Sequence, residues 1–149
     1  MQIINRFNVR VYGVLMNDHD EVLLVHERIG DFEFTKFPGG GMDFGEGTRD
    51  CLKREFLEEA NLDVEIGQHI FTTDYFQPSA FNKTDQLLAI YYWVHPNQSP
   101  INISLEEFEI INHDKPEYLR FFWVKRSELK ADMLTFPVDK MVCNMLGYM

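Results

Sequence analysis

The sequence predicts one α/β or α+β domain that is built around a mixed β-sheet. With 149 residues the chain has the size of a single domain, and no internal repeat or linker-like stretch divides it. Its 45% apolar and 26% charged residues are typical of a globular protein. Strand patterns are interspersed with two helical patterns, as expected for this fold class. We therefore expect one domain over residues 1–149.

The first half of the chain begins with two strand patterns. Residues 7–16, FNVRVYGVLM, predict the first strand, and residues 21–28, EVLLVHER, predict a second one with a continuous apolar run. A loop rich in glycine follows over residues 29–47. A helix is then expected to begin at Thr48, as its N-cap, and to end near Asn61.

The second half of the chain is mostly β-structure. A β-rich section begins at residue 62, and residues 86–96, QLLAIYYWVHP, give its clearest strand pattern. Another strand is expected over residues 119–124, LRFFWV. The chain then predicts a C-terminal helix from about Val138 to Leu146.

The charge and the cysteines exclude several classes of protein. A net charge of -10 argues against binding to nucleic acid polymers or anionic membranes. Two cysteines are too few for a disulfide framework, and we expect both to be reduced and near the core. No stretch has the apolar length of a signal peptide or a transmembrane helix, so we expect a cytoplasmic protein.

The predicted helix, RDCLKREFLEEANL, carries three glutamates on one side. Glu55, Glu58 and Glu59 share an arc of about 100°. Each pair of neighbouring like charges lowers the stability of an isolated helix by about 0.2–0.5 kcal/mol. A solvated acidic face is one explanation, and it is the one that the helix alone favours. The alternative is a site for Mg²⁺ or Mn²⁺, which bind carboxylate oxygens.

The glycines before the helix favour the second explanation. Pro38 is followed by Gly39, Gly40 and Gly41, whose backbone can adopt positive φ and approach a ligand closely. This segment leads towards a helix N-terminus, where free N–H groups favour anions. A loop suited to phosphate and a helix rich in carboxylates together predict metal-assisted chemistry on a phosphate ester or anhydride.

The residues from Gly40 to Leu62 resemble the Nudix box, G-x5-E-x7-R-E-U-x-E-E-x-G-U, in which U is apolar. The matching positions are Gly40, Glu46, Arg54, Glu55, Phe56, Glu58, Glu59 and Leu62. Asn61 stands where the pattern has glycine. We expect the end of the helix to survive this change, because Asn is the residue after glycine that best tolerates a left-handed conformation.

The resemblance implies an α/β/α sandwich with a mixed sheet, in which the box forms a loop–helix–loop. It also implies hydrolysis of a nucleoside diphosphate linked to another moiety, with Mg²⁺ or Mn²⁺ as cofactor. Glu58 and Glu59 would be metal ligands, and Glu55 a ligand or the base that activates water. Arg54 would orient the glutamates. The backbone carbonyl of Gly39 or Gly40 would be a further metal ligand. Glu46 would support the geometry of the loop and the helix.

Family members often pair as dimers, so a homodimer is a further expectation from the resemblance. Two other functions stay open: a nucleoside triphosphate pyrophosphatase that removes noncanonical nucleotides, and a ligand-binding regulator without turnover. The intact set of Arg54 and the three glutamates argues against the regulator.

Residues outside the box are expected to complete the site. Many family members use a further acid outside the box, and we select Glu117 for this role, with Glu106, Glu107 and Glu109 as rivals. The equal alternative is that Glu117 is an ordinary surface residue. Pro78 follows the box at about the distance of a proline in the ADP-ribose pyrophosphatase subgroup, so the chain resembles that subgroup at this position. The expected substrate contacts are Arg10, Phe34, Gly41, Tyr75, Phe76 and Pro78, although aromatic residues in so Phe-rich a chain more often belong to the core.

Overall fold

The computed structural model describes residues 3–112 and 115–149, which form eight strands, two α-helices and two single-turn 3-10 helices. In chain order the elements are β1 (Arg6–Leu15), β2 (Glu21–Ile29), β3 (Phe32–Lys36), β4 (Gly39–Gly41), α1 (Thr48–Ala60), β5 (Val64–Thr72), β6 (Asp85–Pro96), β7 (Phe108–Asn112), β8 (Lys115–Lys125), the 3-10 turns Arg126–Glu128 and Ala131–Met133, and α2 (Pro137–Leu146).

The strands form two four-stranded sheets. The first has the order β4-β1-β6-β5, in which β1 and β6 run parallel while the other pairs are antiparallel. The second has the order β3-β2-β8-β7 and is antiparallel throughout. The predicted mixed sheet is therefore confirmed, and an antiparallel sheet stands beside it.

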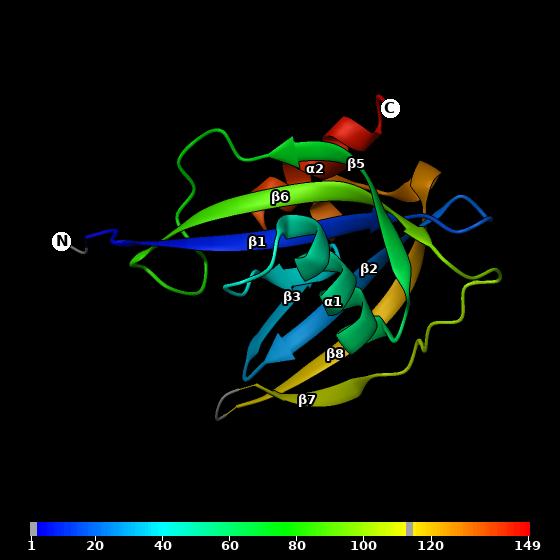
Figure 1. Cartoon of the computed structure of the whole chain (residues 1–149), viewed down its shortest axis with the longest axis horizontal. Coiled ribbons are helices and arrows are strands. Elements are labelled where there is room, and N and C mark those ends of the chain that lie inside the picture. Colours follow the sequence, from blue (N-terminus) through cyan, green and yellow to red (C-terminus); the bar gives the residue numbers. More distant parts are fainter. Residues whose placement is uncertain (1–2, 113–114) are drawn as a thin grey trace.

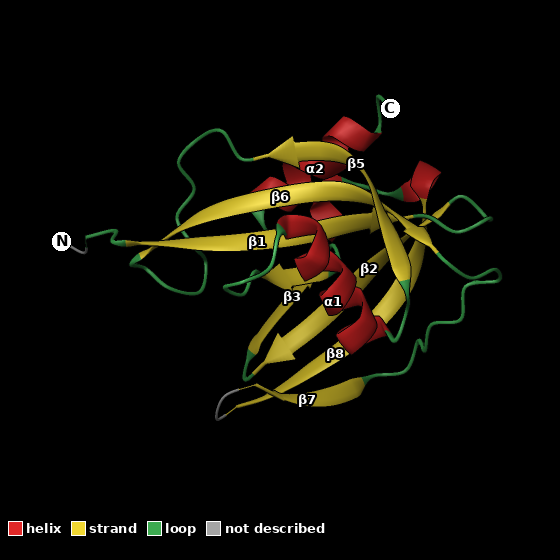
Figure 2. Ribbon diagram, in the orientation of Figure 1, coloured by secondary structure: helices red, strands yellow, loops and turns green. Residues whose placement is uncertain are grey.

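The strands separate two hydrophobic cores, each closed by one helix. On β1, Val11 and Leu15 belong to the core that α1 covers, whereas Tyr12 and Val14 belong to the core that α2 covers. This alternation follows from the two-residue period of a strand. Helix α1 crosses in front of the strands and α2 lies behind them (Figure 1), so that strands run between two helices (Figure 2). The expected α/β/α arrangement is confirmed.

The stretch predicted as one loop, residues 29–47, contains two strands, so this prediction was wrong. Gly39, Gly40 and Gly41 form β4, which pairs with residues 10–12 of β1. Glycine has a low intrinsic preference for strands and carries no side chain that would reveal a pattern. The neighbouring strand supplies the pairing that the local sequence does not indicate. β3, which contains Phe34, and β7 were missed as well.

Helix α1 begins at Thr48, as predicted, but its N-cap is Gly47 and not Thr48. The backbone N–H of Gly47 donates to Oδ2 of Asp50 at 3.0 Å, so the side chain of Asp50 closes the first turn from inside the helix. Leu52 and Phe56 are buried in the core that α1 covers.

The end of α1 is formed by Asn61, in the conformation that the missing glycine would adopt. Its φ of 49° and ψ of 41° lie in the left-handed region. The N–H of the following Leu62 donates to the carbonyl of Phe56 at 3.3 Å, which closes the last turn. The expectation that the helix cap survives the change to asparagine is confirmed.

Asn61→Ala is expected to lower the free energy of unfolding by about 1 kcal/mol, since a Cβ without a local hydrogen-bonding side chain is strained in this region. Asn61→Gly is expected to change it by less than about 0.5 kcal/mol, because relief of strain is offset by the greater freedom of glycine in the unfolded chain. Urea denaturation of the three proteins tests this. An Ala variant as stable as the wild type would contradict it.

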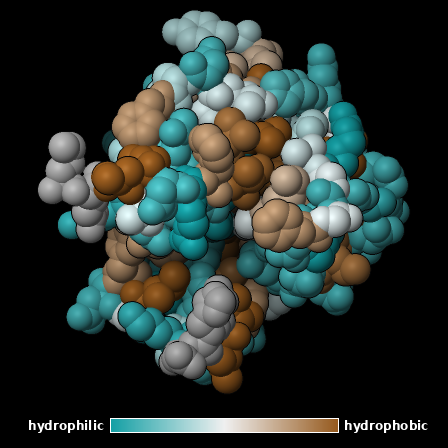
Figure 3. All heavy atoms as spheres, turned by 60° about the vertical axis from the view of Figure 1, so that its left-hand side comes forward, coloured by the Kyte–Doolittle hydropathy of each residue, from teal (hydrophilic) through white to brown (hydrophobic). Residues whose placement is uncertain are grey.

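Cys51 and Cys143 are both buried and unpaired, as expected. Within the described residues, no helix is long and apolar enough to cross a membrane. Some large apolar side chains are exposed, among them Ile3, Phe7 and Phe44. On the face shown in Figure 3, hydrophobic residues lie in several separate groups among hydrophilic ones.

Candidate active site

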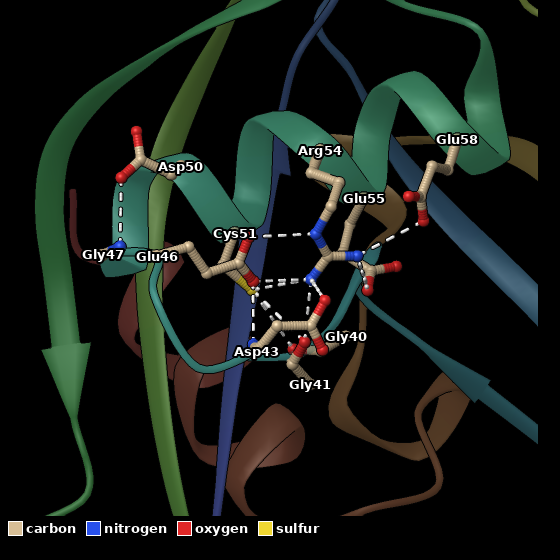
Figure 4. A network of polar contacts seen from close by, with 10 residues as sticks. All are labelled: Gly40, Gly41, Asp43, Glu46, Gly47, Asp50, Cys51, Arg54, Glu55 and Glu58. Atoms are coloured by element: carbon tan, nitrogen blue, oxygen red, sulfur yellow. Dashed lines mark hydrogen bonds and ion pairs between the residues drawn. The ribbon is translucent and has the colours of Figure 1, made fainter.

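Arg54, a half-buried residue of α1, is the centre of a polar network that joins the helix to the loop before it (Figure 4). Its Nε and Nη2 atoms donate to the two carboxylate oxygens of Glu46 at 3.0 and 2.6 Å. These hydrogen bonds, together with one from the backbone N–H of Asp43, lower the pKa of Glu46 to about 2. The loop is thereby fixed to the helix by a two-pronged ion pair.

The same guanidinium also contacts two of the three glutamates. Its Nη1 atom lies 3.1 Å from Oε1 of Glu55 and 3.3 Å from Oε2 of Glu58. Arg54 therefore pairs with Glu58 across one helical turn. Nη2 donates to the carbonyl of Gly41 at 3.1 Å, so this carbonyl is directed towards the helix. The substrate contact expected of Gly41 stays a prediction.

Glu55 lies directly against the backbone of Gly40. A Cβ atom at Gly40 would lie 2.5 Å from the carboxylate carbon of Glu55, a distance at which something must shift. A glycine at this position lets the strand and the carboxylate approach each other. The glycine segment and the glutamate helix, which the sequence set next to each other, are thus in contact in the fold.

Glu59 is half-buried, and its pKa is raised to about 8. Burial is the main cause, and the charge of Lys36 partly offsets it. The nearby carboxylates of Glu55, Glu27 and Glu117 raise the pKa further. Carboxylates from α1, β2 and β8 therefore converge on one region.

Lys36 and Glu27 form a buried ion pair beside this region, and neither was singled out from the sequence. Their side chains are 5% and 4% exposed, and Nζ lies 2.9 Å from Oε2 of Glu27. Nζ also donates to the carbonyl of Gly39 at 3.1 Å. Burial opposes the charge of Lys36, but Glu27 and Glu59 outweigh it and raise the pKa of Lys36 above its ordinary value.

A cavity of about 350 Å³ opens next to these charged groups. Four residues predicted from the sequence line it, namely Arg10, Phe34, Pro78 and Glu117. Further lining residues are Tyr12, Glu27, Lys36, Phe81, Phe136 and Asp139. The cavity therefore has a charged part, which it shares with the carboxylate region, and a part formed by aromatic rings.

The aromatic part consists of Phe34, Phe81 and Phe136. Their ring centroids lie 5.3 to 5.5 Å apart, at the spacing of favourable ring contacts. Asp139, at the start of α2, also lines the cavity and accepts a hydrogen bond from the Tyr91 hydroxyl at 2.5 Å. Burial raises the pKa of Asp139 to about 6, although this hydrogen bond acts in the opposite direction.

Other predicted residues lie outside the cavity. Tyr75 and Phe76 are 41% and 58% exposed and are not among its described lining residues. Glu106, Glu107 and Glu109 are exposed as well. Glu117 is buried and lines the cavity, so its position fits the further acid better than those of its rivals.

The donors of the carboxylate region are oxygen atoms, which suit Mg²⁺ or Mn²⁺. Within residues 3–112 and 115–149, no three His, Cys, Asp or Glu side chains stand close enough together to form a ready metal site. Oε2 of Glu27 is buried and has no hydrogen-bond partner, because its contact with Lys36 is an ion pair without hydrogen-bond geometry. Such an atom fits a region that a cation would complete.

The sequence carried one signal for the missed ion pair. Glu27 follows Val25 by two residues, so the period of the strand places it on the same face as a core residue. A charged residue on such a face needs a buried partner. Phe136 carries no comparable signal, because only the fold brings it to Phe34.

Comparisons with known proteins bear on the family and the fold of the chain. The family model described as NUDIX domain matches residues 6–145. Nucleoside diphosphate-linked moiety X motif 6 of Xenopus laevis is 28% identical over 137 residues, which cover 91% of this chain but only 58% of that protein. The chain thus spans less than two thirds of the curated relative.

Solved structures with the same fold share less sequence. The MutT protein from Methanosarcina mazei Go1 has a TM-score of 0.70 at 17% identity, with 99% of this chain and 97% of that chain covered. The E. coli ORF135 protein has a TM-score of 0.68 at 15% identity, with 96% and 90% covered. At these identities the likeness shows a common fold.

Proposed function

The chain belongs to the Nudix family, which its family match over residues 6–145 shows, and on that basis we propose that it hydrolyses a pyrophosphate linkage in a nucleoside diphosphate joined to another moiety. The observation that carries this proposal is the position of Glu55, Glu58 and Glu59. They project from one helix that Arg54 braces, beside a cavity with a charged and an aromatic part.

The residues of the box fit the roles that a divalent cation requires. Glu58 and Glu59 would hold the cation, together with the carbonyl of Gly39 or Gly40. When bound, Mg²⁺ or Mn²⁺ supplies a water of lowered pKa and neutralises phosphate charge. Glu55 would bind the cation or accept the proton of the attacking water. Arg54 keeps the carboxylates of Glu55 and Glu58 in place, and Glu117 is the proposed acid outside the box.

The cavity suits the two ends of such a substrate. Arg10 lines it near the carboxylate region and would attract phosphate oxygens. Phe34, Phe81 and Phe136 offer ring faces and edges on which a nucleobase can stack. Pro78 lines the same cavity, which supports ADP-ribose or a nucleotide sugar as the finer choice of substrate. A homodimer remains a prediction from the resemblance.

A nucleoside triphosphate pyrophosphatase is the second candidate, favoured by the common fold with proteins described as MutT. The two functions differ in their products. Hydrolysis of ADP-ribose or a nucleotide sugar gives two monophosphates, whereas a triphosphate pyrophosphatase releases pyrophosphate.

A panel of ADP-ribose, nucleotide sugars and nucleoside triphosphates, each with Mg²⁺ or Mn²⁺, tests the proposal. Chromatography of the products identifies the bond that breaks. We expect turnover that requires the metal and that falls strongly in Glu58→Gln. Ligand binding by the folded protein without turnover of any of these compounds would contradict the proposal and favour a regulator.

The pKa of Glu59 leads to a prediction about stability without metal. In the folded chain this pKa lies at about 8, above its ordinary 4.5, so the folded state binds the proton more tightly than the unfolded state. The resulting stabilisation is complete below about pH 4.5 and is lost as the pH rises towards 8. Urea unfolding in EDTA is therefore expected to become easier as the pH rises from about 4.5 to about 8.

Two controls accompany this measurement. Glu59→Gln removes the titrating group and is expected to flatten the dependence over this range. Saturating Mg²⁺ is expected to restore stability at high pH, because the cation binds the charged carboxylate. An equally steep loss of stability in Glu59→Gln would show that another group is responsible.

A further inference from the structure

A second cavity, of about 410 Å³, lies at the C-terminal end of α1, the lower end of the helix in Figure 1. It is lined by residues of that helix end, of the segment before β7, and of the strands β7 and β8, among them Glu59, Asn61, Asn102, Ser104, Phe108 and Phe121. Of these six, only Glu59 also belongs to the carboxylate region. The second cavity therefore adjoins that region but is built mostly from other residues.

The two cavities lie along the same face of β8. Glu117 lines the first cavity and Phe121 lines the second, and the even spacing between them directs both side chains to one side of the sheet. At about 3.4 Å per residue they are roughly 13 Å apart along the strand. A substrate whose diphosphate lies at the carboxylates can therefore place one end in the first cavity and the other end in the second.

The second cavity suits an uncharged group that carries hydroxyls. The described residues that line it include no Lys, Arg or His. It also borders the last residues of α1, where the helix dipole is negative and carbonyl oxygens lack partners within the helix. A phosphate is repelled at such a place, whereas a hydroxyl can donate to these carbonyls and can pair with Asn or Ser side chains.

Asn61 adds to this cavity an amide that a glycine would not supply. The residue stands where the Nudix box has glycine, and it lines the cavity. The side-chain amides of Asn61 and Asn102 are exposed and have no hydrogen-bond partner among residues 3–112 and 115–149. The ring of Phe108 stacks on that of Phe121, with centroids 6.2 Å apart, and forms an apolar wall. An apolar wall with a few polar groups is typical of sites for small molecules.

We propose that the second cavity binds the moiety that the diphosphate joins to the nucleoside, and that this moiety is an uncharged sugar whose hydroxyls Asn61 and Asn102 recognise. The inference rests on the proposed function, because the diphosphate has to lie at the carboxylate helix. It goes further in naming the group at the second end of the substrate. It also disfavours a nucleoside triphosphate, whose terminal phosphates would enter a cavity without cations.

Binding without turnover tests the inference. The background is Glu55→Gln with saturating Mg²⁺, so that the compounds stay intact. Isothermal titration calorimetry measures the affinities for ADP-ribose, UDP-glucose and GDP-mannose and for their parent diphosphates ADP, UDP and GDP. The sugar compound that binds most tightly is then compared with its parent diphosphate in variants of the second cavity.

Asn61→Gly and Asn102→Ala each remove one amide. Asn61→Gly keeps the end of α1, because glycine adopts the left-handed conformation without strain. Each variant is expected to bind the sugar compound about 3–10-fold more weakly, the effect of one lost hydrogen bond, and the parent diphosphate within about twofold of the unchanged background. Gln98→Ala is the control, since Gln98 is exposed in the same segment and is not among the described lining residues. It is expected to leave both affinities within about twofold.

A sugar compound that binds both folded variants as tightly as the unchanged background would overturn the inference. An equal loss of affinity for the sugar compound and for the diphosphate would overturn it as well. Both outcomes leave the proposed function intact, because turnover of the substrate panel decides that function separately. A selective loss for the sugar compound in a wild type without turnover would contradict the proposed function and support the second cavity as a sugar site. Circular dichroism shows whether each variant is folded, and Asn102→Ala decides alone where Asn61→Gly is not.

Discussion

Glu55→Gln is expected to lower kcat by about 10²–10⁴-fold, the range over which a positioned general base contributes to catalysis. The amide has the same shape as the carboxylate and can still accept a hydrogen bond from Arg54. It cannot take up the proton of the attacking water, and it is a weaker ligand for a hard cation. Steady-state kinetics at saturating Mg²⁺, with the substrate that the panel identifies, measure this effect.

Glu65→Gln is a suitable control for this variant. Glu65 is an exposed residue of β5 whose contact with Lys53, at 3.6 Å, lies outside the site. This change is expected to leave kcat within about twofold, since exposed ion pairs contribute little. A kcat in Glu55→Gln that stays within tenfold of the wild type would exclude Glu55 as the base.

Arg54→Ala is expected to lower the free energy of unfolding by about 2–3 kcal/mol and kcat by about 10–100-fold. The side chain is 26% exposed, so its ion pairs are only partly screened by water. Without it, Glu46 and Glu55 lose their common partner and the loop is no longer tied to α1. Urea denaturation at pH 7 and steady-state kinetics measure the two effects separately.

Arg54→Lys is the matched control, because it keeps the charge and loses the fork that binds both oxygens of Glu46. It is expected to recover only part of the stability. The pKa of Glu46 gives a further test: it lies at about 2 in the folded chain, below its ordinary 4.5. The stability that it contributes is present above pH 4.5 and is lost as the pH falls towards 2.

The difference in stability between the wild type and Arg54→Ala is therefore expected to narrow as the pH falls below 4.5. A difference that stays constant down to pH 2 would show that Arg54 stabilises the fold through its packing and not through Glu46.

The sequence was most informative where a pattern is local. The period of β1, β2 and β6 and the spacing of the glutamates on α1 depend on residues that are close in the chain, so these elements and the bracing by Arg54 could be predicted. The left-handed conformation of Asn61 could also be predicted, because it follows from the chemistry of one residue at the end of a helix.

Features that depend on distant partners could not be predicted. β4 consists of glycines and exists because β1 pairs with it. Lys36 and Glu27 form an ion pair only because β2 and β3 lie side by side, with Val25 opposite Lys36. The aromatic part of the cavity joins Phe34 of β3 to Phe136 beside α2. In each case the local sequence carries only one half of the contact.

The parallel pairing of β1 with β6 has a consequence for how the chain folds. Arg6 pairs with Asp85, 79 residues farther along, so the first strand has no parallel partner until most of the chain has been synthesised. Loops of this length must close before the mixed sheet can form, and such topologies fold slowly. We expect a slow refolding reaction in which metal binding appears together with the sheet, because the glutamate helix rests on β1 and β4.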